Sequence, residues 1–125
     1  MEIKTERVHV SVDGKTMGAY MARPADGIPR PGVLVYMEIF GVNAHIRDVT
    51  DRVAREGYVA LAPDFFHRTG PGVEYGYDQT GMTEGIKLLT QLKADEIVAD
   101  ARAAMSFLKR QNFAKGDKLG AMGFC

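Results

Sequence analysis

The last three residues of the chain have the types and spacing of a catalytic nucleophile. Gly123, Phe124 and Cys125 follow a short apolar run, and Cys125 is the only cysteine in the sequence. In the nucleophile-elbow pattern, the nucleophile lies on a sharp strand-to-helix turn, with one residue between it and the glycine on each side. The chain supplies the first three of those positions, with Cys in place of Ser. The alternative is a buried cysteine at a strand end, because free Cys is among the most buried residue types.

Glu38 is the second residue whose position indicates chemistry. It ends the apolar run 32–37, where its carboxylate is at risk of losing contact with water. A carboxylate near Cys125 would change the proton affinity of the thiol. The loop after such a strand also supplies the second N–H donor of an oxyanion hole, which makes the amide of Ile39 or Phe40 the candidate. The alternative for Glu38 is a solvated strand end or a helix-cap partner.

An α/β domain is predicted to position these residues. Periodicity and turn residues predict a hairpin of strands 8–12 and 16–22, strand 32–37, helix 43–56, strand 58–62, a long loop 65–80, helices 83–92 and 95–109, and strand 118–124. Asp13-Gly14 is the expected hairpin turn, and Gly57 the expected stop of the first helix. Because strands and helices alternate after the hairpin, we expect a mostly parallel sheet.

The predicted parallel strands bring three polar residues to one edge of the sheet. Right-handed crossovers place Glu38, Asp64 and Cys125 at the carboxyl ends of neighbouring strands, where open α/β sheets bind ligands. The last strand has the apolar run of a strand buried on both faces, which predicts a central place in the sheet. We therefore expect that residues 1–125 alone do not form a stable, active domain. The second long helix is expected to bury Ile97, Ala101, Met105 and Leu108.

The composition is that of one ordinary globular domain. Of 125 residues, 46% are hydrophobic and 26% charged, and 16 Lys+Arg balance 16 Asp+Glu. A net charge of zero gives no reason to expect nucleic acid or an anionic membrane as a partner, and no run is long enough to span a bilayer. No Cys/His spacing suits zinc, and we expect neither metal nor cofactor. The sequence lacks a signal-peptide pattern, which favours a cytoplasmic, reducing location.

Three motifs together resemble the dienelactone hydrolases, also called carboxymethylenebutenolidases. They are Met-Glu-Ile-Phe-Gly-Val-Asn at 37–43, Gly-Tyr-Val-Ala-Leu-Ala-Pro-Asp-Phe-Phe at 57–66, and Met-Gly-Phe-Cys at 122–125. The resemblance runs from about Val8 to Cys125 and implies an α/β-hydrolase fold. In the family, the Asp and His of the catalytic triad follow the nucleophile, which is the general order in α/β-hydrolases. The chain 1–125 therefore resembles the N-terminal half of a single such domain, ending at the nucleophile elbow.

The resemblance also implies roles for particular residues. Cys125 corresponds to the nucleophile, Glu38 to the carboxylate that contacts the resting thiol, and the amide of Ile39 to an oxyanion donor. The catalytic base and acid are expected beyond residue 125, in a C-terminal half of the same domain. The three histidines all precede the nucleophile and are expected to be surface or capping residues: His9, His45 and His67.

The predicted substrate pocket includes Phe40 and Met82. The family member that acts on dienelactone uses an arginine near the start of the helix that is expected here around Met82. No arginine lies between Arg68 and Arg102 in this sequence. The resemblance therefore implies an ester or lactone that is less anionic than dienelactone.

Three classes of function remain open from the sequence. The first is a hydrolase in which Cys125 attacks a small ester or lactone and forms an acyl-enzyme. The second is a non-catalytic α/β binding module on the same fold. The third is a redox-sensing thiol, although the chain has no second cysteine to resolve an oxidised one.

Overall fold

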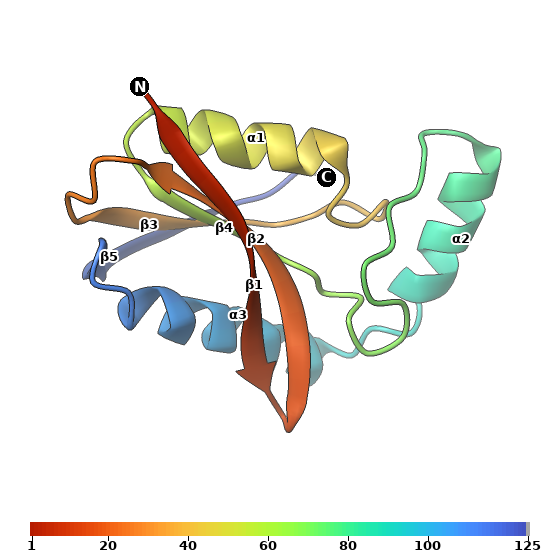
Figure 1. Ribbon diagram of the computed structural model, residues 1–125. Coiled ribbons are helices and arrows are strands. Elements are labelled where there is room, and N and C mark those ends of the chain that lie inside the picture. The colour runs from red at the N-terminus through yellow and green to blue at the C-terminus, as the bar shows by residue number, and fades with distance from the viewer. Residues whose placement is uncertain (125) are drawn as a thin grey trace.

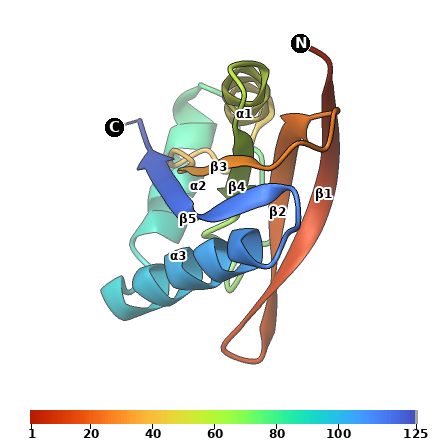
Figure 2. The same cartoon turned by 90° about the vertical axis from the view of Figure 1, so that its left-hand side faces the viewer.

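The computed structural model describes residues 1–124, and Cys125 lies outside the described residues. The elements are, in order, β1 (Ile3–Val12), β2 (Lys15–Pro24), β3 (Arg30–Val35), α1 (Ala44–Arg55), β4 (Val59–Pro63), α2 (Gln79–Leu89), α3 (Ala94–Lys109) and β5 (Ala114–Met122). Helix α1 covers one face of the sheet and α3 the other, while α2 lies beyond the end of the sheet (Figure 1). A quarter turn shows the same layers, with β3 and β4 between α1 and α3 (Figure 2).

The described strands form one sheet in the order β1-β2-β4-β3-β5. Strand β3 pairs in parallel with both β4 and β5, and the N-terminal hairpin joins β4 in antiparallel orientation. The hairpin turn consists of Asp13 and Gly14, whose φ angles of 51° and 72° are those of a type I′ turn. The predicted hairpin and parallel strands are therefore confirmed. No helix among residues 1–124 is long and apolar enough to cross a membrane.

Strand β4 is buried on both faces because its alternate side chains enter two separate cores. Val59 and Leu61 pack with the cluster under α3, and Ala60 and Ala62 pack with the cluster under α1. This double burial is what the continuous apolar run predicts for a strand between neighbours.

Helix α1 begins and ends where the sequence predicts. The side chain of Asn43 accepts a hydrogen bond from the Ile46 N–H over 3.1 Å and so caps the helix. Gly57 follows the helix with a φ of 101°, a left-handed conformation that suits glycine. Ile46 and Val49 are buried against the sheet and lie on the apolar face of the helix.

The predicted buried stripe of α3 is partly wrong. Leu108 is buried as expected, but Ile97 is 37% exposed, and the buried row consists of Asp100, Ala104 and Leu108. This row is spaced by four residues and places a carboxylate in the core. The carboxylate of Asp100 contacts His67 and Arg68, which are far from it in the sequence. The apolar pattern of the helix therefore could not indicate that Asp100 is buried.

Strand β5 is longer than predicted and differs in burial from the prediction. It starts at Ala114 instead of 118, and within residues 1–124 it pairs with β3 alone. The segment Gly120–Phe124 is half-buried or exposed, because no strand or helix among the described residues covers its outer side. A central place for this strand stays a prediction for a longer chain.

Candidate active site

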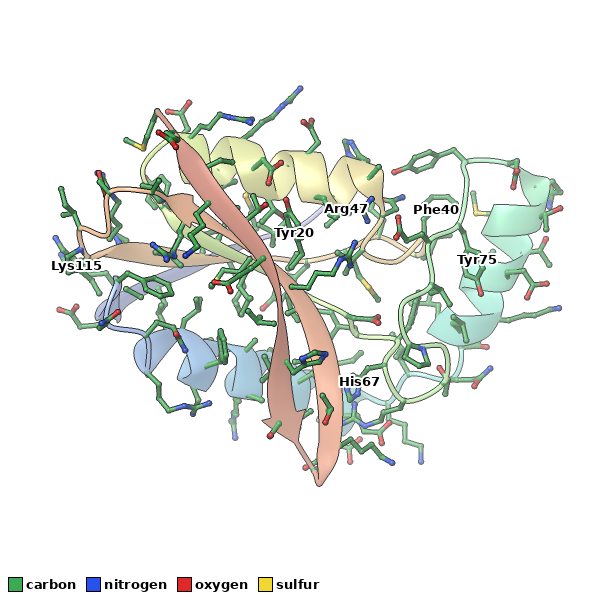
Figure 3. The ribbon with its side chains drawn as sticks, in the orientation of Figure 1. Tyr20, Phe40, Arg47, His67, Tyr75 and Lys115 are labelled. Atoms are coloured by element: carbon green, nitrogen blue, oxygen red, sulfur yellow. The ribbon has the colours of Figure 1, made fainter. Side chains whose placement is uncertain are left out.

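A tight turn after strand β3 carries Glu38 and Phe40. The Gly41 N–H donates to the Glu38 carbonyl oxygen over 3.1 Å and closes the turn. Gly41 has a φ of 84°, and a Cβ at this position would collide with the carbonyl oxygen of Val73. The Tyr75 N–H donates to the Phe40 carbonyl oxygen over 2.9 Å, and Figure 3 shows both residues on the side of the molecule nearest α2. The loop after β4 therefore holds this turn in place.

The directions of the two candidate oxyanion amides follow from this turn. No peptide bond in the described chain is cis, so each N–H points opposite to the carbonyl of the same peptide unit. The Glu38 carbonyl faces Gly41, and the Ile39 N–H therefore points out of the turn. The Ile39 carbonyl faces Gly85 of α2, and the Phe40 N–H therefore points away from that helix. Among residues 1–124, neither N–H donates a hydrogen bond.

The end of β5 lies beside the end of β3. Val35 pairs with Met122, and the Tyr36 N–H donates to the Met122 carbonyl oxygen over 2.8 Å. This register brings the segment before Cys125 next to the segment before Glu38, as the predicted crossovers require. Cys125 itself falls outside the described residues, so its expected contact with Glu38 stays a prediction.

Two hollows adjoin Glu38, which is a half-buried residue that lines both. The first has a volume of about 570 Å³, and Ile39 and Phe124 are among its lining residues. The second has a volume of about 500 Å³, and the predicted pocket residues Phe40 and Met82 line it. The described part of the chain has no cluster of three His, Cys, Asp or Glu side chains that could hold a metal ion.

Tyr77 is a site residue that the sequence did not indicate. Its hydroxyl donates to Glu38 Oε1 over 3.2 Å and accepts from Asn43 Nδ2 over 3.1 Å. Its ring packs edge-on against Phe40, with ring centroids 4.5 Å apart. Tyr77 lies 39 residues after Glu38, and the only local signal was the number of aromatic residues in the long loop.

Asp64, the third residue predicted at the sheet edge, shapes the loop after β4. Its Oδ1 accepts from the Phe66 N–H over 3.0 Å, and its Oδ2 accepts from the Gly72 N–H over 2.8 Å. Burial raises the pKa of the Asp64 carboxyl, and these two backbone hydrogen bonds oppose the rise. Because both oxygens bind backbone amides, Asp64 orders the loop that holds Gly41.

The expectation that all three histidines lie at the surface or cap a helix is wrong for His67. His9 and His45 are exposed, but the side chain of His67 is 1% exposed. Its Nε2 lies 3.1 Å from Asp100 Oδ1, and Arg68 donates to Asp100 Oδ2 over 2.8 Å. The buried carboxylate of Asp100 on α3 binds His67 and Arg68, and these contacts connect the loop after β4 to that helix. Figure 3 labels His67.

Residues 17–125 match the sequence model of the Dienelactone hydrolase family. The chain belongs to this family. A Synechocystis protein named "Putative carboxymethylenebutenolidase" is 42% identical over 125 residues, which cover 100% of this chain and 51% of that protein. The carboxymethylenebutenolidase of Pseudomonas putida is 33% identical over 123 residues, which cover 97% of this chain and 51% of that protein.

The solved structures agree with the fold derived from the elements. A crystal structure of a "Putative Dienelactone Hydrolase" from Klebsiella pneumoniae superposes with a TM-score of 0.86 at 35% identity, covering 100% of this chain and 51% of that chain. The described elements thus have the α/β-hydrolase fold of the dienelactone hydrolases. The chain spans about half the length of the curated relatives that it matches.

Proposed function

We propose that this member of the dienelactone hydrolase family hydrolyses small esters or lactones, with Cys125 as the nucleophile. Membership of the family supports hydrolysis of this substrate class. The observation that carries the proposal is the turn after β3, which leaves the Ile39 N–H unpaired among residues 1–124, in a segment lining the same hollow as Phe124. An unpaired, fixed N–H beside the expected nucleophile is the arrangement that stabilises an oxyanion.

The proposed chemistry proceeds through a thioester. The Cys125 thiolate forms a bond to the substrate carbonyl carbon, and the π electrons of the carbonyl move to its oxygen, which the Ile39 N–H stabilises. When the carbonyl re-forms, the C–O bond of the ester breaks and the alkoxide leaves, taking up a proton to become an alcohol. Water then attacks the thioester, releasing the acid and the thiol. The base and acid that move these protons are proposed to lie in a C-terminal half of the domain, because the triad order places them after the nucleophile.

The substrate is proposed to be uncharged near Met82. The six residues that line the second hollow include the carboxylates Glu38 and Asp78 and no Lys or Arg. Like charges repel, so a substrate with its own carboxylate would bind there less well than a neutral one of the same shape.

The test is hydrolysis of a neutral aryl ester by the full-length protein and by its Cys125→Ser variant. Turnover is expected to fall by about 10³-fold or more in the variant, as it does when other catalytic nucleophiles are replaced. Absent turnover in the wild type would favour a non-catalytic binding module. Oxidation of the thiol by peroxide without any ester turnover would favour a redox-sensing thiol instead.

A further inference from the structure

Tyr77 joins three elements of the candidate active site through one hydroxyl group. Glu38 follows β3, Asn43 caps α1, and Tyr77 lies in the loop before α2. The hydroxyl is within hydrogen-bond distance of both other side chains, at 3.2 Å from Glu38 Oε1 and 3.1 Å from Asn43 Nδ2.

The helix cap fixes the direction of this hydrogen-bond chain. Asn43 Oδ1 accepts from the Ile46 N–H, so its Nδ2 is the atom that faces Tyr77, and an amide nitrogen can only donate. The Tyr77 oxygen accepts that hydrogen bond and has its own proton left to donate to Glu38 Oε1. Glu38 Oε2 has no hydrogen-bond partner among residues 1–124.

Packing holds the ring although Tyr77 is 61% exposed. The ring packs edge-on against Phe40, which is itself only 8% exposed. Partial desolvation of the hydroxyl and the nearby Glu38 carboxylate raise the pKa of Tyr77 above its ordinary value. The other ionisable groups near Tyr77 are Asp78, which follows it in the chain and lines the same hollow, and the His45 ring, whose centroid is 6.4 Å away.

We propose that Tyr77 is a positioning residue that fixes the Glu38 carboxylate, occupying Oε1 and leaving Oε2 to receive the hydrogen bond of the Cys125 thiol. The inference rests on the proposed roles of Glu38 and Cys125. Tyr77 touches no reacting atom in this scheme and acts through Glu38 alone. Removal of the Tyr77 hydroxyl should therefore change the reactivity of Cys125 only in a protein that keeps a carboxylate at position 38.

The experiment is a double-mutant cycle in the full-length protein, with Tyr77→Phe, Glu38→Gln and the pair. Phe keeps the ring and its contact with Phe40 and removes only the hydroxyl. Tyr75→Phe is the matched control, because the side-chain hydrogen bonds of tyrosine hydroxyls in residues 1–124 involve Tyr20 and Tyr77. The first readout is the pH profile of Cys125 alkylation by iodoacetamide, which requires no ester turnover. The second readout is the separate measurement of kcat and KM with a neutral aryl ester.

The proposal predicts that Tyr77→Phe moves the alkylation profile in the same direction as Glu38→Gln and lowers kcat by about three- to tenfold with little change in KM. Tyr75→Phe leaves both unchanged. In the Glu38→Gln background, Tyr77→Phe should add less than about a twofold effect.

An unchanged alkylation profile in Tyr77→Phe would overturn the proposal, as would an equal effect of Tyr77→Phe in both backgrounds. A protein that hydrolyses no ester, yet shows the predicted alkylation cycle, would refute the proposed function and leave the role of Tyr77 intact. If the protein is an active esterase but the double-mutant cycle does not show the predicted pattern, the proposed role of Tyr77 would be refuted and the proposed function would stand.

Discussion

Gly85 of helix α2 lies so close to the backbone carbonyl of Ile39 that a Cβ at Gly85 would overlap the carbonyl oxygen. The helix therefore sets the direction of the peptide unit that joins Ile39 to Phe40. The turn that bears the candidate oxyanion amides is held on one side by this helix and on the other by Val73, whose carbonyl leaves no room for a Cβ at Gly41. An element outside the sheet thus determines the geometry of a site at the end of the sheet.

The first prediction concerns Gly85→Ala in the full-length protein. Helix propensity alone would stabilise the protein by about 1 kcal/mol, but the Cβ must push the Ile39 carbonyl away. We expect kcat/KM for a neutral ester to fall about tenfold or more, because the proposed oxyanion donors would lose their alignment. Gly18→Ala is the control, since a Cβ there has nothing within 4 Å and should leave kcat/KM unchanged. Full activity together with a raised melting temperature in Gly85→Ala would show that α2 does not set this turn.

The buried cluster on α3 gives a prediction about stability. The side chains of His67 and Asp100 are each 1% exposed, and Arg68 also binds Asp100. Asp100→Asn removes the charge that Arg68 pairs with, and the free energy of unfolding should fall by about 3 kcal/mol. Arg68 also pairs with two more exposed carboxylates, those of Asp13 and Glu96. Glu96→Gln removes the one at 3.4 Å, which is 32% exposed, and should cost less than about 1 kcal/mol. Equal losses in denaturant titrations of the two variants would contradict a structural role specific to Asp100.

How far these features could be predicted from the sequence depends on how local their causes are. The hairpin at Asp13-Gly14 and the bounds of α1 follow from residues within a few positions of one another, and both were predicted, although the capping role of Asn43 was not. The burial of Asp100 depends on His67, 33 positions away, and no periodicity in α3 reveals that partner. The same holds for Tyr77 and Glu38, which only the tertiary fold brings together. The predicted start of α2 at residue 83 is wrong, because the helix begins at Gln79. Asp78 caps it by accepting from the Gly81 N–H over 2.7 Å, and an aspartate at this position is a local signal for a helix start.

Asp64 gives a prediction about pH. Burial raises its folded-state pKa above the ordinary value of 3.8, so the folded state binds more protons than the unfolded state between these two pKa values. The free energy of unfolding must then decrease as pH rises through that window. We expect the difference in unfolding free energy, wild type minus Asp64→Asn, to be largest below pH 3.8 and to shrink toward neutral pH.

Asp26→Asn is the control for this measurement, because folding lowers the pKa of Asp26 and raises that of Asp64. A hydrogen bond from Arg30 lowers the pKa of Asp26, so the stability that its carboxylate adds is present above its unfolded pKa and is lost as pH falls. The wild type minus Asp26→Asn difference should therefore grow with rising pH. The same slope for both variants would contradict the buried environment of Asp64.

Cys125 is proposed to form an acyl-enzyme with a small ester, and the most direct test is to identify the acylated residue. The full-length protein is mixed with an aryl ester of a slowly hydrolysed acid, quenched in acid during turnover, digested and analysed by mass spectrometry. We expect one acyl group on the peptide that contains Cys125, which appears with the burst of aryl alcohol and is absent from Cys125→Ser. Rapid ester turnover with the acyl group on another residue, or on none, would contradict it.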